Sequence, residues 1–168
     1  MASRDELYAK FGITAEAAQL FETALGTFLL GAEGLKRGWH EAPDRTKATE
    51  TVSRIEKSTL GRLLKSTQGV IEFDDALIAA FQKALATRNR LMHGFYLRHD
   101  FSIQTDEGRD EMINDLEEMH TSLFNAWQLA DTMSGVLLNY LMELRTDPDS
   151  AGRGPATKIQ FKIRQGNP

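Results

Sequence analysis

The sequence contains no cysteine, and this absence removes several kinds of chemistry at once. Disulfide bonds, thiolate zinc sites, iron–sulfur clusters and a cysteine nucleophile all depend on that residue. Proline is also scarce: the chain has four, and all of them lie outside the stretches in which apolar residues recur with a regular period. The 168 residues, 41% of them hydrophobic, are nevertheless enough to form one domain with a core of its own.

Long apolar runs are absent as well. No run approaches the roughly 18 residues that cross a bilayer, and the first residues lack the basic-then-apolar pattern of a secretory signal. We therefore expect a cytoplasmic protein with no membrane partner. The net charge is −4, from 20 basic and 24 acidic residues, which argues against a general nucleic-acid coat protein but leaves room for a local basic patch.

What the sequence does contain is helical periodicity, which is strongest over residues 106–144. Two series of apolar residues with a seven-residue spacing run through this segment, like the a and d positions of a heptad repeat. They are Leu116, Leu123, Ala130, Leu137 and Leu144, and Met112, Met119, Ala126, Met133 and Tyr140. This heptad seam predicts one long C-terminal helix with a core or interface side, and its length favours some contribution to a dimer.

The first third of the chain predicts shorter helices. We expect a helix over residues 3–10 that Gly12 ends, and a second helix over residues 15–36 that Thr14 caps. Glycines within the second helix weaken it, but they can let a neighbouring helix approach closely. Residues 38–55 are polar and weakly periodic, which favours an irregular connection.

Two more helices are expected in the middle of the chain. One begins near Ser58 or Thr59 and ends before Gly69. The other begins after Phe73, and Gly94 is placed to end it as the C′ residue. Its predicted buried residues are Leu77, Ile78, Phe81, Leu85, Leu91 and Met92.

Together these segments predict an all-α fold, an up-and-down helical bundle over residues 1–145. Residues 146–168 differ: a linker rich in proline, glycine and aspartate precedes a basic segment at 158–164. That segment alternates polar and apolar residues like a strand, but the sequence offers no partner strand. We expect a flexible linker and an extended tail, which needs a surface to dock on because a lone strand is unstable.

The sequence RNRLMHG at residues 88–94 places strong polar groups near the end of a predicted helix. Asn89 and His93 are four residues apart and share a helix face, whereas Arg88 is about 140° around an ideal helix from His93. Histidine can act as a general acid or base, and arginine can bind phosphate oxygens. Capping of the helix carbonyls by basic side chains explains the same residues without any further role.

This segment resembles the HEPN family, all-helical domains in which a helix ends in an Arg-Asn-x3-His motif. Two features extend the resemblance: the aromatic pair Phe95-Tyr96 that follows the motif, and the segment STLGRLLK at residues 58–65. Many members have a similar Thr-Leu-Gly segment that opens a helix. The resemblance covers residues 15–144 loosely and leaves the tail out.

The resemblance implies a metal-independent endoribonuclease of toxin or defence type that uses no cofactor. Catalytic members are homodimers that bring two copies of the motif into one cleft. Matched by position, Arg88 and His93 would be the catalytic pair and Asn89 a supporting polar residue. His93 would act on the 2′-hydroxyl or the leaving 5′-oxygen, and Arg88 would stabilise charge on the phosphate. RNA and an antitoxin protein would be the partners.

Three further residues are candidates for binding RNA. Arg90 and Arg98 lie close to Arg88 in the sequence and could hold phosphates. Tyr96 follows the histidine by three residues, whereas some members of the family place a tyrosine two residues after it.

Two alternatives remain open from the sequence. Some HEPN domains do not cleave RNA, and the chain would then be a catalytically silent module that binds a protein or a nucleotide. In addition, His40, His99-Asp100 and Asp131 follow the order of an HD-type metal phosphohydrolase, another all-helical class.

Overall fold

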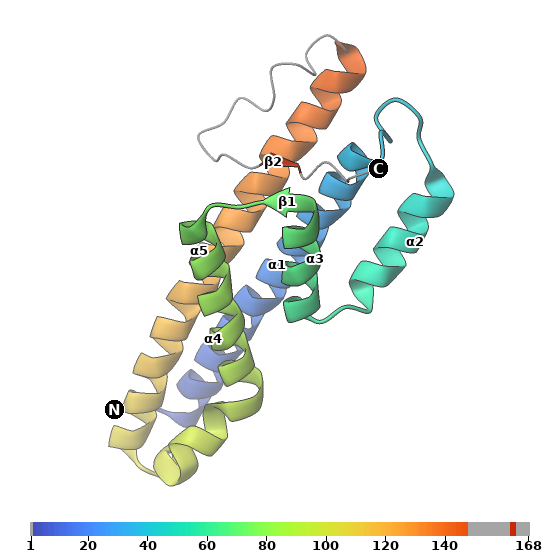
Figure 1. Cartoon of the computed structure of the whole chain (residues 1–168). Helices are drawn as coiled ribbons and strands as arrows, with labels where there is room; N and C mark the ends of the chain where they lie inside the picture. The colour runs from blue at the N-terminus through green and yellow to red at the C-terminus, as the bar shows by residue number, and fades with distance from the viewer. Residues whose placement is uncertain (1, 148–161, 164–168) are drawn as a thin grey trace. The chain divides into compact units, whose positions relative to one another are not determined.

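Helices make up most of the part of the chain that the structure describes (Figure 1). The computed structural model describes residues 2–147 and 162–163. Its elements are α1 (Arg4–Lys36), α2 (Arg45–Glu56), α3 (Leu60–Val70), β1 (Ile71–Glu72), α4 (Asp75–His99), the 3-10 helix η1 (Asp100–Gln104), α5 (Asp106–Thr146) and β2 (Lys162–Ile163). The predicted all-α class and the long C-terminal helix are confirmed. Within these residues, no helix combines the length and the apolarity that a membrane span requires.

The chain forms two compact units, and each unit takes residues from separate parts of the sequence. The first unit consists of Met1–Phe21 and Ala79–Gln128, and the second of Glu22–Ile78 and Leu129–Pro168. The unit boundaries fall inside α1, α4 and α5, so each of these helices contributes residues to both units. The RNRLMHG segment belongs to the first unit.

The heptad seam of α5 is buried within this chain. All ten of its residues are buried, and the most exposed of them, Tyr140, is only 8% exposed. In the first unit the Thr14 hydroxyl of α1 donates to the carbonyl oxygen of Leu116 at 3.4 Å, and in the second unit the Ser134 hydroxyl donates to that of Ala24 at 3.1 Å. The seam is therefore core, and the expectation that it contributes to a dimer is wrong because its side chains are already covered.

α1 is one continuous helix, and the predicted break at Gly12 is wrong. An interior glycine costs about 1 kcal/mol relative to alanine, but the buried stripe continues across it through Leu7, Thr14 and Phe21. Thr14 is not a cap: its hydroxyl donates to the carbonyl oxygen of Lys10 at 2.8 Å, one turn earlier in the same helix. Burial of the whole stripe outweighs the local cost of the glycine.

α2 occupies a segment that the sequence analysis expected to be irregular. Its N-cap is Asp44, whose carboxylate accepts a hydrogen bond from the Lys47 amide at 2.9 Å. This hydrogen bond lowers the pKa of Asp44 below its usual value. The helix buries a single residue, so its apolar period is weak. An ion pair from Arg54 to the buried Glu33 of α1 holds it in place.

α3 begins where the sequence predicts. Thr59 is its N-cap, and the Thr59 hydroxyl accepts a hydrogen bond from the Arg62 amide at 3.4 Å. The helix continues through Gly69 and ends at Val70, slightly beyond the predicted end. Its buried residues are Leu60, Leu63, Leu64 and Thr67.

Two glycines let helices of the second unit approach closely, as the sequence suggested. A Cβ atom added at Gly26 of α1 would lie 2.8 Å from Cγ2 of Ile55 in α2. One added at Gly31 would lie 3.0 Å from Cδ2 of Leu137 in α5. A larger residue at either position would push the facing helix away.

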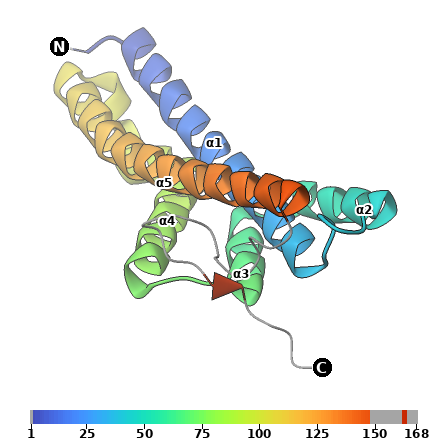
Figure 2. The same cartoon turned by 90° about the horizontal axis from the view of Figure 1, so that it is seen from above.

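The basic segment of the tail has a partner strand after all. β2 lies beside the end of α3 (Figure 2), where it pairs antiparallel with β1, Ile163 opposite Ile71 and Lys162 opposite Glu72. Two-residue strands give no periodic pattern, which is why the sequence analysis missed β1. The other residues of the predicted strand lie outside the described residues.

α4 continues past Gly94 to His99, so the predicted C′ role of Gly94 is wrong. Phe95 is buried and extends the core side of the helix by another turn. The backbone becomes left-handed only at Asp100, with φ at 44°, where η1 begins. Of the residues expected in the core, Leu77, Phe81 and Leu91 are buried, Ile78 and Leu85 are half-buried, and Met92 is exposed.

Candidate functional site

α4 presents part of the RNRLMHG segment to solvent. Leu91 and Phe95 are buried on the core side of the helix. Asn89 and His93, one helical turn apart, are exposed on another side. A ligand can therefore reach the amide and the imidazole together without any change in the helix.

Arg88 is half-buried, and its guanidinium lies beside the exposed Asn89. Its Nη1 lies 3.4 Å from Oδ1 of Asn89, a long hydrogen bond between neighbouring side chains. Five residues correspond to about 140° of rotation on an ideal helix, so Arg88 and His93 are attached to different faces of α4. A second copy of α4 that faces the first would bring an arginine to each histidine.

Arg90 belongs to a polar cluster that the sequence analysis missed. Its Nη2 donates to Oδ1 of Asp115 on α5 at 2.7 Å, and Oδ2 of the same carboxylate lies 2.9 Å from Nε2 of His99. The side chains of His99 and Asp115 are only 14% and 17% exposed. The His99 ring also packs on Phe95, with ring centroids 4.8 Å apart. The charge of Arg90 is thus balanced by the carboxylate of Asp115.

The metal-site alternative is not supported by a cluster of ligands. Among residues 2–147 and 162–163, no group of three or more histidine, aspartate or glutamate side chains is placed to hold a metal ion. His99, one of the residues in the HD-type order, is instead engaged by Asp115.

Exposed apolar side chains lie around His93 on α4. Met92 is 47% exposed, Tyr96 41% and Leu97 85%. We call these three residues the α4 apolar surface. Large apolar side chains that gather on an exposed helix are typical of an interaction surface.

Tyr96 is both part of this surface and a predicted site residue. Its ring packs against Phe11 of α1, with centroids 5.5 Å apart. Partial burial, with a smaller contribution from the charge of Tyr8, raises the pKa of Tyr96 above its usual value of 10.0. The hydroxyl therefore stays protonated at neutral pH and is available as a hydrogen-bond donor.

All six predicted site residues lie on α4. Asn89, His93, Tyr96 and Arg98 are exposed, and Arg88 and Arg90 are half-buried. The helix thus brings an amide, an imidazole, a phenol and a guanidinium to the surface, while the other two arginines lie partly inside.

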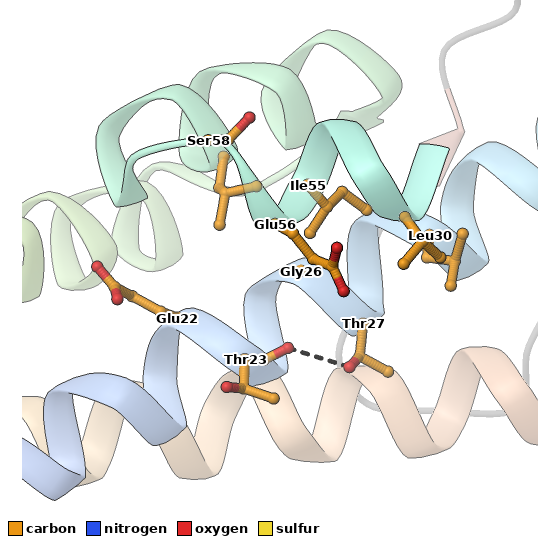
Figure 3. Close-up of a pocket in the computed structure, with 10 residues that line it drawn as sticks. Glu22, Thr23, Gly26, Thr27, Leu30, Ile55, Glu56 and Ser58 are labelled. Atoms are coloured by element: carbon orange, nitrogen blue, oxygen red, sulfur yellow. Dashed lines mark hydrogen bonds between the residues drawn. The ribbon is translucent and has the colours of Figure 1, made fainter. Parts of the chain in front are cut away.

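The second unit contains a cavity that the sequence gave no reason to expect (Figure 3). It has a volume of about 380 Å³ and is lined by α1, the end of α2 and the start of α3. Its wall mixes apolar side chains such as Leu30 and Ile55 with the carboxylate of Glu56. The Thr27 hydroxyl in this wall already donates to the carbonyl oxygen of Thr23 at 3.0 Å. None of the predicted site residues lines this cavity.

Comparison of the chain with models of protein families, with characterised proteins and with solved structures finds no match. The chemistry and exposure of the α4 residues are therefore the basis for assigning a function.

Proposed function

We propose that the chain is a metal-independent endoribonuclease of toxin or defence type, a HEPN-like homodimer whose active site combines arginine and histidine from two subunits. One observation carries the proposal: Asn89 and His93 are exposed together on α4, while the half-buried Arg88 is attached about 140° around the helix from His93. A second α4 that faces the first would supply each histidine with an arginine.

The chemistry needs no metal because RNA carries its own nucleophile. His93 takes the proton of the 2′-hydroxyl as that oxygen attacks the adjacent phosphorus. The bond from phosphorus to the 5′-oxygen breaks, and the partner's His93 gives that oxygen a proton, which leaves a 2′,3′-cyclic phosphate and a free 5′-hydroxyl. Arg88 stabilises the charge that builds up on the phosphate oxygens, and Asn89 orients the reacting groups.

The surroundings of His93 suit such an arrangement. The α4 apolar surface gives a second subunit apolar area to bury beside the motif. Tyr96 keeps its proton and can donate to a phosphate oxygen, and the exposed Arg98 adds a positive charge on the same helix. The substrate that these groups fit is a flexible, negatively charged strand.

The test is cleavage of RNA by the wild type and by His93→Ala, both in excess EDTA. General acid–base catalysis contributes about 100-fold or more, so we expect His93→Ala to lose at least that factor in rate. His120→Ala is the matched control, since His120 lies on α5 and stacks on Phe124 at 5.5 Å, outside the motif. The control should cleave like the wild type.

Other outcomes would count against the proposal. If none of the proteins cleaves any of a varied set of RNAs while circular dichroism shows them folded, the chain is instead a catalytically silent binding module. Activity that EDTA abolishes would point to a metal enzyme. Equal rates for His93→Ala and wild type would remove His93 from the site.

A further inference from the structure

A second cavity of the second unit, of about 290 Å³, is lined by residues from three helices and one turn. Gly31 and Gly34 of α1 form one wall, and Trp39 and His40 of the following turn form another. Leu141 and Arg145 close it from the C-terminal end of α5, and α2 contributes one alanine. Mostly apolar walls with a few converging polar groups are typical of small-molecule sites.

The wall that carries Trp39 is held by the backbone. The Trp39 amide donates to the carbonyl oxygen of Gly34 at 2.9 Å, and the turn passes through Gly38, which has a positive φ of 68°. A Cβ atom at Gly34 would lie 3.0 Å from Cε3 of the Trp39 ring, so only glycine lets the indole pack this closely. The guanidinium of Arg37 lies on the same indole, 6.0 Å from its centroid. The flat ring is thus fixed as part of the cavity wall.

His40 brings an unsatisfied polar atom to this cavity. Its side chain is 13% exposed, and its Nδ1 is buried without a hydrogen-bond partner among the described residues. Nε2 lies 3.7 Å from the carboxylate of Glu41, which is beyond hydrogen-bond distance. A buried nitrogen with no partner costs free energy, and native proteins nearly always provide such a group with a partner. A ligand in the cavity can be that partner.

Arg145 brings a positive charge to the same cavity. It lies in the last turn of α5 and is exposed, and no carboxylate among the described residues pairs with it. The nearest acidic neighbour of His40, Glu41, is 81% exposed and therefore screened by water. The planar guanidinium presents paired donors that match a carboxylate.

We propose that this cavity binds a small aromatic monocarboxylate. The ring of the ligand packs against Trp39 and Leu141, its carboxylate pairs with Arg145, and one carboxylate oxygen accepts a hydrogen bond from Nδ1 of His40. The cavity volume lies near the lower end of the range for ligand sites, which fits a single-ring acid. The site uses no residue of the RNRLMHG segment, so this proposal can be tested independently of the ribonuclease proposal.

The test uses the intrinsic fluorescence of Trp39. The chain has two tryptophans, so Trp127→Phe leaves Trp39 as the single reporter. We titrate this protein with phenylacetate, and with benzyl alcohol and benzylamine as uncharged and cationic probes of similar size. We expect phenylacetate alone to change the Trp39 emission in a saturable way.

Variants then assign the binding groups. Arg145→Gln and His40→Phe should each weaken phenylacetate binding tenfold or more. His40→Asn should retain most of the affinity, because asparagine can place an N–H close to the position of Nδ1. Lys57→Gln removes the same charge from an exposed position outside the cavity and should leave binding unchanged. Circular dichroism checks that every variant is folded.

Four results would overturn the proposal. Equal binding of benzyl alcohol would show that the carboxylate is not recognised, and unchanged affinity in Arg145→Gln would remove the charge from the site. Tighter binding of phenyl phosphate than of phenylacetate would make the occupant a phosphate ester. No emission change with any probe at millimolar concentration would mean that water alone satisfies His40.

Discussion

At the scale of single residues, Asp115 changes the interpretation of the predicted site. It accepts from Arg90 and lies within hydrogen-bond distance of His99 through its two carboxylate oxygens, so two basic residues of α4 depend on one carboxylate of α5. Arg90, predicted from the sequence to bind substrate, is thereby held against the protein. We therefore predict that Arg90 positions this part of α4.

Replacement of Asp115 by asparagine should measure this coupling. The change leaves Arg90 with a neutral partner in a partly buried setting, and we expect the free energy of unfolding to fall by about 1–3 kcal/mol in urea denaturation. Asp131→Asn on the same helix is the matched control, because Asp131 is exposed. The control should change stability by less than about 0.5 kcal/mol. Equal stabilities of the two variants would contradict a structural role for the cluster.

The same residues show how far the sequence could predict the candidate site. The RNRLMHG segment is local, so its residue types and spacing are visible without a structure. The partners of Arg90 and His99 are not, because Asp115 is 25 and 16 residues away and meets them only when α4 and α5 pack. The unsatisfied Nδ1 of His40 depends in the same way on three-dimensional packing, which no spacing in the sequence encodes.

At the scale of elements, the sequence predicted best where burial is periodic and failed where local propensity opposed burial. α5 was found because ten core residues repeat every seven positions. The predicted ends at Gly12 and Gly94 were wrong, because a cost of about 1 kcal/mol per glycine is smaller than the gain from burying Thr14 or Phe95 beyond it. α2 was missed because it is held by a cap and an ion pair, not by an apolar face.

Two substitutions compare a helical glycine that has open space around it with one that is in close contact with another segment. At Gly94 an added Cβ atom meets nothing within 4 Å, so Gly94→Ala should stabilise α4 by about 0.5–1 kcal/mol and raise the melting temperature. At Gly108 an added Cβ atom would clash with the carbonyl oxygen of Ser102, so Gly108→Ala should lower the melting temperature by forcing η1 away from α5. Thermal denaturation followed by circular dichroism measures both. A destabilised Gly94→Ala variant would show that α4 does not run straight through this residue.

At the scale of the whole molecule, all residues of the heptad seam are buried within the chain. Its length suggested a dimer from the sequence, but its ten side chains are buried without a second subunit. The proposed homodimer therefore has to use another surface. The α4 apolar surface is the candidate, because it adjoins His93 and leaves Leu97 85% exposed.

Leu97→Glu tests this interface directly. A buried charge at the centre of a subunit contact is strongly unfavourable. We therefore expect the variant to behave as an 18.8 kDa monomer in light scattering and to lose RNA cleavage while circular dichroism shows that it is still folded. Leu138→Glu is the control, since Leu138 is a 45% exposed leucine on α5 in the second unit. A wild-type protein that is already a monomer at micromolar concentration would contradict the composite site.

The division of the chain into two units also has a consequence for how a gene that encodes such a protein can evolve. Each unit is assembled from two separate stretches of sequence, and the boundaries fall within helices and not within linkers. A single uninterrupted piece of gene therefore encodes neither unit. Two ready-made modules joined end to end could not produce this arrangement, and recombination at any one point between residues 22 and 128 would divide both units at once.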